Sequence, residues 1–353
     1  MARLAVTTTA VFAFAAACSD SPTAPEPQLS LECTVPQQDV RDAGIGRDTI
    51  PALTNPDVVQ LGDPGLFYAD PQGHVLGIIV DGVPLAIPLN ILWWHEIVNM
   101  NFANQKIAVT YSPFTGSALI FDRTQAAAAG FEVSKYLYKN NLVMRDQDTE
   151  SLWPQMSRGA RCGELAGWDL VPIPAFQTNW GTWLNLHRDT WAVSSLTGFD
   201  RFYTLYPYGD YADLENTLTP FPMDLDTRRP PKELVLGIPV GTGGIAFPFG
   251  KLAERGLVSI ADAEVNGERI VVFWNWFANT AVAFHPEVDG LELHFDLVDG
   301  TRTDIETGTS WNLEGWGYDG PLSGKKLLQV EDAYVSYWFA WADFQPDTEI
   351  WGN

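Results

Sequence analysis

A histidine and a glutamate stand side by side in the segment LNILWWHEIVN, at His95 and Glu96. An imidazole titrates near neutral pH, so it can bind a ligand or move a proton. We expect a helix over residues 89–99, in which His95 and Asn99 share one face whereas adjacent side chains diverge. His95 with Glu96 is therefore the candidate catalytic pair. The alternative is a histidine that only hydrogen-bonds a neighbouring strand beneath two tryptophans.

Hydroxyl groups gather in the segment YSPFTGS, which we expect to connect two strands. Ser112, Thr115 and Ser117 offer hydroxyls, and Tyr111 could donate a hydrogen bond into a cleft. A nucleophilic serine also needs a base and an oxyanion hole, and the sequence has no Gly-x-Ser-x-Gly elbow. Turn chemistry explains the segment without catalysis. The predicted ligand-binding set is Trp94, His95, Asn99, Tyr111, Ser112, Thr115 and Ser117.

Two acidic pairs, Asp146/Asp148 and Asp304/Glu306, invite comparison with the paired carboxylates of glycosidases. Each pair is followed by a threonine, then by a serine or threonine, and then by a tryptophan. Because this pattern occurs twice, we favour a structural role over catalysis. We predict paired turn and capping residues that hold the tryptophan.

The chain holds fourteen tryptophans, which can stack on flat ligands when they are exposed. Trp153 and Trp311, and the later pairs Trp180/Trp183 and Trp338/Trp341, occupy matching places in the two parts of the chain, so we assign them to the core. The tryptophans without a counterpart are better candidates for a binding surface: Trp93, Trp94, Trp168, Trp274 and Trp276.

One sequence pattern occurs twice along the chain. VLGIIVDGVPLAIPLNIL at residues 75–92 matches VLGIPVGTGGIAFPFGKL at residues 235–252, and three further blocks follow in the same order. The period is far longer than that of solenoid repeats, which indicates a duplicated half with a pseudo-two-fold relation. A motif kept in both copies is interpreted as fold. We therefore expect a single site where the first copy departs from the second, as at His95 and Glu96, which face Arg255 and Gly256.

The patterns predict a strand-dominated α+β protein with few, short helices. Residues 73–80 and 83–87 form an expected hairpin around Asp81-Gly82, and Pro88 then begins the helix. Strands are expected at residues 107–111, 118–122, 131–138 and 142–145, and a short helix at 179–187. The expected organisation is a tether and entry strap at 18–60, a first β-rich repeat at 61–190, a Tyr/Pro-rich connector at 191–230 and a second β-rich repeat at 231–345.

The first eighteen residues, MARLAVTTTAVFAFAAAC, hold one arginine, an apolar run and small residues before Cys18. This run is too short to span a bilayer as a mature helix, and the ending resembles a bacterial lipoprotein box. We predict a signal peptide at 1–17, lipidation of Cys18 and a membrane-anchored body in the cell envelope. An ordinary secretory signal is the alternative. Cys33 and Cys162 could pair in an oxidising compartment, but sequence leaves this open.

The acidic composition limits the classes of molecule that the protein can bind. The net charge is −23, whereas nucleic-acid phosphates require a basic surface, so we expect no nucleic-acid partner. The remaining histidines, at 74, 187, 285 and 294, show no metal-type spacing, so no metal site is predicted. The sequence leaves the cofactor unknown.

Several segments resemble the bacterial domain-of-unknown-function 3179 family: GRDTIPALTNPDVV, VDGVPLAIPLNILWWHEIVN, VTYSPFTGSALIFDR, HRDTWAVSSLTGF and PPKELVLGI. The resemblance spans roughly residues 45–345 and implies an exported protein without an agreed reaction. Members of that family often carry cysteines at the positions of Ser112 and Thr115. This chain has neither, so a thiolate metal or redox role is not implied for it.

Three hypotheses about function follow. In the first, an envelope lipoprotein binds a small ligand in a cleft between the halves, near His95 and residues 112–117. In the second, an extracytoplasmic hydrolase uses His95 with Glu96 or a hydroxyl. In the third, the protein is a scaffold without a small-molecule site. A buried, fully hydrogen-bonded His95 favours the third hypothesis, whereas an open pocket that joins His95, Tyr111 and Thr115 favours the first two.

Overall fold

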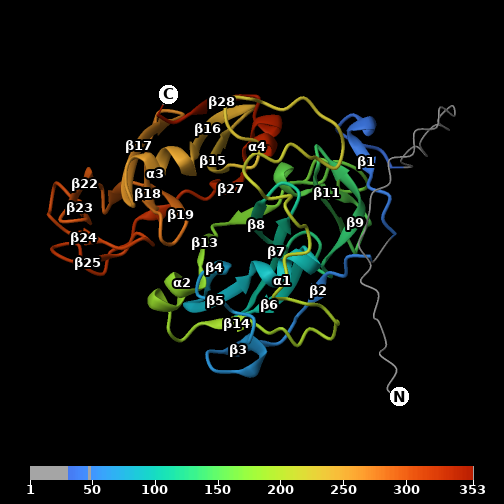
Figure 1. Ribbon diagram of the computed structural model, residues 1–353, viewed down its shortest axis with the longest axis horizontal. Helices are drawn as coiled ribbons and strands as arrows, with labels where there is room; N and C mark the ends of the chain where they lie inside the picture. Colours follow the sequence, from blue (N-terminus) through green and yellow to red (C-terminus); the bar gives the residue numbers. More distant parts are fainter. Residues whose placement is uncertain (1–30, 47–48, 353) are drawn as a thin grey trace, which may run out of the picture. The chain divides into compact units, whose positions relative to one another are not determined.

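The computed structural model describes residues 31–46 and 49–352. In this part of the chain, strands far outnumber helices, and the four α-helices hold only six or seven residues each. The predicted strand-dominated α+β fold with few, short helices is confirmed. In Figure 1 the strands of the first half run from blue to green, and those of the second half lie beside them in orange and red.

The first half contains three sheets. The predicted hairpin is present as β4 (His74–Val80) and β5 (Val83–Pro88), because Asp81-Gly82 takes the positive φ angles that a tight turn needs. Its sheet has the order β13-β4-β5-β14-β3, and β14 runs parallel to β5. The other strands of this sheet are β13 (Phe176–Asn179), β14 (Trp191–Val193) and β3 (Val58–Gln60).

The other two sheets of the first half are antiparallel, except that β2 runs parallel to β6. The second sheet, β12-β8-β7-β6-β2, contains β6 (Ile97–Phe102), β7 (Gln105–Ser112), β8 (Ser117–Asp122), β12 (Val171–Ile173) and β2 (Leu53–Thr54). The third sheet, β1-β9-β10-β11, contains β1 (Val40–Asp42), β9 (Phe131–Tyr138), β10 (Asn141–Asp146) and β11 (Leu152–Pro154).

The second half repeats this order. Its first sheet, β27-β15-β16-β28, contains β15 (Leu234–Val240), β16 (Gly243–Pro248), β27 (Tyr334–Tyr337) and β28 (Asp347–Ile350), and β28 runs parallel to β16. The next sheet contains β17 (Val258–Val265), β18 (Glu268–Asn275), β19 (Thr280–His285) and β26 (Leu328–Gln329). The third contains β22 (Phe295–Val298), β23 (Thr301–Asp304), β24 (Ser310–Trp311) and β25 (Gly317–Asp319), and a short pair, β20 (Glu287–Val288) and β21 (Leu291–Glu292), precedes it.

A glycine under a tryptophan recurs in both hairpin sheets. A Cβ atom on Gly77 would lie 2.2 Å from the Trp183 ring, and one on Gly237 would lie 2.2 Å from the Trp341 ring. Each indole also donates from Nε1 to a threonine hydroxyl at 2.8 Å, Thr190 in the first half and Thr348 in the second. These tryptophans lie in α2 (Trp180–Leu186) and α4 (Trp338–Phe344), and both are completely buried.

The first aspartate of each acidic pair holds a tryptophan, whereas Asp148 accepts from Ala129 N and Glu306 binds His294. Asp146 Oδ2 accepts from Trp153 Nε1 at 2.8 Å, and Asp304 Oδ2 accepts from Trp311 Nε1 at 2.9 Å. The hydroxyl of the threonine three residues later bonds each carboxylate as well. Duplication itself stays a prediction, and the matched strand orders and these matched networks support it.

The predicted helix over residues 89–99 is too long. Helix α1 covers Leu89–His95, and Glu96 then takes a φ of 55°, which breaks the helical path. Residue Asn99 consequently lies in strand β6, so His95 and Asn99 do not share a helix face. In the second half, α3 (Phe249–Glu254) ends close to Gly256, whose φ is 140°.

The entry segment is fixed to the first half by a disulfide between Cys33 and Cys162, whose Cα atoms lie 3.9 Å apart. Backbone hydrogen bonds flank it, from Thr34 N to Arg161 O and from Gly163 N to Glu32 O. The predicted signal peptide and Cys18 lie outside the described residues. Within the described ranges, no helix is long and apolar enough to cross a membrane.

Candidate functional site

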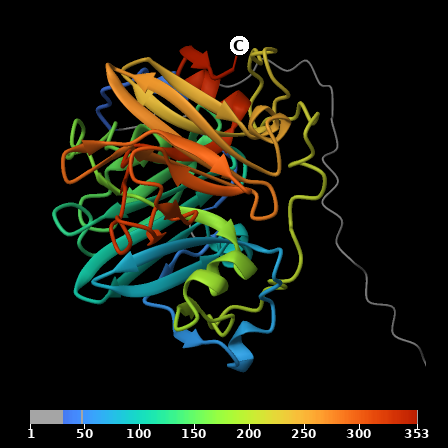
Figure 2. The same cartoon turned by 90° about the vertical axis from the view of Figure 1, so that its left-hand side faces the viewer.

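A cavity of about 540 Å³ lies between the two halves. Its polar wall combines His74 and Tyr111 of the first half, Tyr206 of the connecting segment, and Lys232 and Tyr337 of the second half. The connecting segment, yellow-green in Figure 2, runs along both halves. Since all three parts of the chain contribute, neither half could form this cavity without the other.

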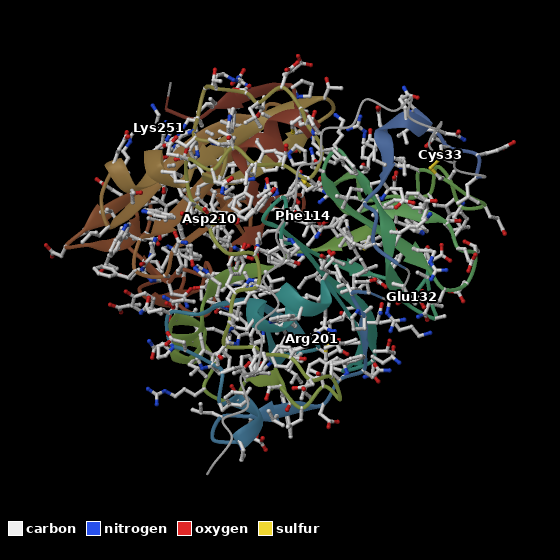
Figure 3. The ribbon with its side chains drawn as sticks, turned by 45° about the vertical axis from the view of Figure 1, so that its right-hand side comes forward. Cys33, Phe114, Glu132, Arg201, Asp210 and Lys251 are labelled. Atoms are coloured by element: carbon white, nitrogen blue, oxygen red, sulfur yellow. A yellow bond between two sulfur atoms is a disulfide. The ribbon has the colours of Figure 1, made fainter. Side chains whose placement is uncertain are left out.

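Reciprocal contacts between loops position the wall. Backbone N–H of Tyr337 donates to Thr115 O at 2.8 Å, so the 112–117 loop of the first half reaches β27 of the second. In the opposite direction, Asn179 Nδ2 donates to Phe277 O at 2.8 Å. Gly116 lies so close to the Tyr337 ring that an added Cβ atom would be 2.9 Å from it. Figure 3 shows Phe114 and Asp210 at this meeting of the halves.

Tyrosines of the connecting segment tie it to the first half. The Tyr208 hydroxyl donates to Trp93 O at 3.2 Å, and the Tyr211 hydroxyl donates to Phe114 O at 2.9 Å. Burial raises the pKa of both phenols, which therefore stay protonated at any physiological pH. These bonds hold the neighbouring Tyr206 against the cavity.

On two cavity-lining residues, a buried polar atom lacks a well-aligned hydrogen bond in the described chain: His74 Nδ1 and the Tyr206 hydroxyl, which lies beside the Tyr337 phenol. Burial raises the pKa of Tyr206 to about 12, and a hydrogen-bonding contact with the Tyr337 phenol acts in the opposite direction. Burial also lowers the pKa of His74, so its imidazole is neutral at pH 7. Both atoms are closed off from the cavity space itself, so the accessible polar groups of its wall come from other residues.

The amino group of Lys232 is the unusual charge of this site. The residue is 3% exposed, and burial lowers its pKa to about 7. Its Nζ donates to Leu218 O at 2.8 Å and lies 3.7 Å from the centre of the Tyr211 ring. Among the described residues, no carboxylate forms an ion pair with it.

The neighbouring carboxylate is already neutralised. Glu233 accepts from Arg229 Nε at 2.6 Å and from Arg229 Nη2 at 2.7 Å, and its Oε1 also accepts from Gly250 N at 3.0 Å. A bidentate arginine pair of this kind satisfies a carboxylate with two parallel bonds. Glu233 is consequently not a counter-ion for Lys232.

The predicted catalytic histidine lies outside the cavity wall. His95 is completely buried, with Nδ1 2.7 Å from Pro51 O and Nε2 2.7 Å from the Tyr203 hydroxyl. Burial lowers its pKa, the Pro51 bond opposes that shift, and the charge of Arg201 adds to it. Both ring nitrogens therefore have partners, which is the arrangement that favours a structural role.

Glu96 is buried at 4% exposure, and desolvation raises its pKa to about 8. A charge on Glu96 would raise the pKa of Tyr111, which lines the cavity, and of Tyr208. Glu96 therefore lies near the cavity, although it does not line the cavity itself. A carboxyl group held protonated at neutral pH can donate a hydrogen bond or a proton.

The hydroxyls of the 112–117 loop form a buried network. Thr115 Oγ1 lies 2.8 Å from Ser117 Oγ, and both accept from Asn141 Nδ2. Ser117 Oγ also donates to Gln155 Oε1, and Ser112 Oγ accepts from the backbone of Leu142. These hydroxyls bond to the protein itself, and only Tyr111 of the predicted ligand-binding set lines the cavity.

The remaining predicted residues lie apart. Asn99 exchanges two hydrogen bonds of 2.8 Å with the backbone of Phe131, so it joins two sheets. Trp94 is partly buried, and its Nε1 has no partner in the described chain. Of the copy-specific tryptophans, Trp93 lines the cavity, Trp274 is buried, and Trp168 and Trp276 are exposed. In the described ranges, no three His, Cys, Asp or Glu side chains gather as metal ligands.

Sequence reasoning missed Lys232, His74, Tyr206 and Tyr337. The comparison of the two copies carried a signal for Lys232, because Gln72 occupies the matching position ahead of the VLGI motif. The connecting segment carried another, since four of its residues between 203 and 211 are tyrosines. Neither signal says that the segment folds back over a cavity.

Fold and site together define a strand-rich protein with an open cavity large enough for a small molecule. The chain belongs to the family described as "Protein of unknown function (DUF3179)", whose model matches residues 47–348. This match confirms the resemblance inferred from the sequence. No curated protein and no solved structure matches the chain.

Proposed function

We propose that this protein binds a small, largely apolar molecule that carries a hydrogen-bonding oxygen, in the cavity between its halves. The observation that carries the proposal is the cavity of about 540 Å³ itself, in which Tyr111, Lys232 and Tyr337 stand among mainly apolar side chains of both halves.

The rest of the wall favours an apolar body for the ligand. Leu89, Trp93, Leu234 and Phe249 line the cavity, and they surround the few polar groups. Small-molecule sites typically combine such an apolar wall with a few polar atoms that orient the ligand. The Tyr111 and Tyr337 hydroxyls can donate to a ligand oxygen.

Native and denatured mass spectrometry of the full chain, exported by a bacterial host, tests this function. We expect a mass excess that is lost on denaturation. Tyr337→Phe removes one oxygen and should reduce the excess, as should Leu234→Trp, which fills the cavity. Tyr318→Phe is the matched control, because Tyr318 is 55% exposed. Absence of any excess, or an excess that Leu234→Trp leaves unchanged, contradicts the proposal.

A hydrolase that uses Glu96 is the second candidate. The observation that favours it is a buried carboxyl with a pKa raised to about 8, beside the tyrosines of the cavity. Such a group could supply a proton to a leaving group. Hydrolysis of a panel of ester and glycoside substrates that is lost in Glu96→Gln, but kept in His95→Asn, would favour this candidate over simple binding.

We also propose that lipid on Cys18 anchors the protein in the cell envelope. The sequence around Cys18 supports it, and so does the disulfide between Cys33 and Cys162, which is typical of an oxidising compartment. Fractionation of an expressing bacterium should place the chain with membranes, whereas Cys18→Ser should not be lipidated. Recovery of both proteins in the same soluble fraction contradicts the anchor.

A further inference from the structure

Lys232 lies where the connecting segment, the second half and the cavity meet. Its backbone N–H donates to Leu214 O at 3.2 Å, and its Nζ donates to Leu218 O at 2.8 Å. This carbonyl is the one oxygen acceptor recorded for Nζ in the described chain. An ammonium has three N–H bonds, so two of them point to no oxygen in that part of the protein.

The groups around Nζ are aromatic. The centres of the Tyr211, Phe339 and Tyr337 rings lie 3.7, 4.2 and 5.6 Å from Nζ. The ring faces favour the ammonium form, whereas removal from water disfavours it. Burial prevails and lowers the pKa to about 7, so a substantial fraction of the side chain is a free amine at neutral pH.

The framework that the two halves share does not require a lysine here. The matching position of the first half is Gln72, which precedes an equivalent strand and an equivalent glycine–tryptophan contact. Glu233, the next residue, is paired with Arg229 and leaves Lys232 without a counter-ion. A residue that the second half alone carries, buried and unneutralised in a cavity, is a candidate for chemistry.

We propose that Lys232 forms an imine with the carbonyl group of an aldehyde or ketone bound in the cavity, an inference that rests on the proposed function. The Nζ lone pair attacks the carbonyl carbon, and the oxygen takes up a proton to give a carbinolamine. Loss of the nitrogen proton and of the hydroxyl as water then leaves a carbon–nitrogen double bond. The reaction needs no oxidant or reductant.

The surroundings suit each part of this reaction. An uncharged lysine in an apolar pocket is an activated nucleophile towards carbonyl compounds. The phenols of Tyr337 and Tyr111 line the same cavity and stay protonated at neutral pH, because burial raises the pKa of both. They are therefore donors for the carbonyl oxygen and for the departing hydroxyl.

Reductive trapping tests the inference. The full chain is incubated at pH 7 with benzaldehyde and cyanoborohydride, which converts an imine into a stable benzylamine, and labelled peptides are quantified by mass spectrometry. We expect labelling of Lys232 at least tenfold faster than that of Lys251, which lies partly exposed in the same half. Lys232→Arg should abolish the fast label, and Lys251→Arg is the matched control. The wild-type comparison between lysines requires no variant to fold.

The outcomes separate the two proposals. In one outcome the label is confined to surface lysines, while benzaldehyde still raises the melting temperature of the wild type but not of Leu234→Trp. This result overturns imine formation and keeps the binding cavity. No shift in melting temperature, no fast label and no co-purified mass overturn both. Fast labelling of Lys232 that rises between pH 6 and 8, as its pKa of about 7 requires, supports the inference.

Discussion

The two halves differ where they approach the cavity and agree where they form their cores. In the first half Glu96 occupies the positive-φ position after the helix, whereas the second half has Gly256 there. In the second half Lys232 and Tyr337 face the cavity, where the first half has Gln72 and Asn179. Glycine–tryptophan and aspartate–tryptophan contacts are the same in both. Shared residues thus maintain the fold, and the unshared ones divide the site between the halves.

The largest expected loss of stability comes from substitutions in the packing that both halves share. Gly77→Ala and Gly237→Ala would each place a Cβ atom 2.2 Å from a completely buried tryptophan ring. Since neither ring can move without emptying the core, each substitution should cost at least about 3 kcal/mol of unfolding free energy or prevent folding. Chemical denaturation measures the loss. If one variant is as stable as the wild type, the two halves do not share this constraint.

Glu96→Gln tests the difference between the halves at the position after the helix, where the first half has a buried glutamate and the second half a glycine. The pKa of Glu96 is raised from 4.5 to about 8 in the folded state, so the native protein binds more protons than the unfolded chain between these pH values. The stability of the wild type should therefore fall by about 2 kcal/mol between pH 6 and 8 from this group. The variant should lose this slope. An unchanged pH dependence of urea unfolding would show that Glu96 is not buried as described.

Asp146→Ala and Asp304→Ala measure how alike the halves are. Each removes the acceptor of a buried tryptophan N–H and of a threonine hydroxyl. Loss of such a buried network should cost about 2 kcal/mol in either half. Thermal unfolding compares the two variants. A difference much larger than 1 kcal/mol between them would mean that one half depends on its network more than the other.

The smallest expected effect on stability comes from Tyr206→Phe. Its hydroxyl has only the Tyr337 phenol beside it and no well-aligned hydrogen bond in the described chain, so its removal should change the unfolding free energy by less than about 0.5 kcal/mol, or stabilise the protein. Tyr211→Phe is the contrasting variant, because that hydroxyl donates to Phe114 O, and its loss should cost about 1 kcal/mol. Equal destabilisation by both would indicate that Tyr206 has an intramolecular partner.

Much of the fold was predictable because it depends on local patterns. The hairpin at 73–87 shows strand alternation around Asp-Gly, and the paired tryptophans show themselves as core by recurring in both halves. The end of α1 was not predictable, because an ordinary residue, Glu96, adopts the conformation for which the second half has a glycine. The partner of His95, Tyr203, comes from a segment without any periodic pattern, so neither its approach nor the burial of Lys232 beneath the same segment was visible in the sequence.

The strand order has a consequence for how the chain reaches its native state. The β4–β5 hairpin forms early in the sequence, yet both of its flanks are completed by β13 and β14, which follow the other two sheets of the half. The hairpin of the second half likewise awaits β27 and β28 at the end of the chain. Closure of such distant contacts is slow, so on a ribosome each hairpin would stay without its flanking strands until more than a hundred further residues, or in the second half about ninety, had been synthesised.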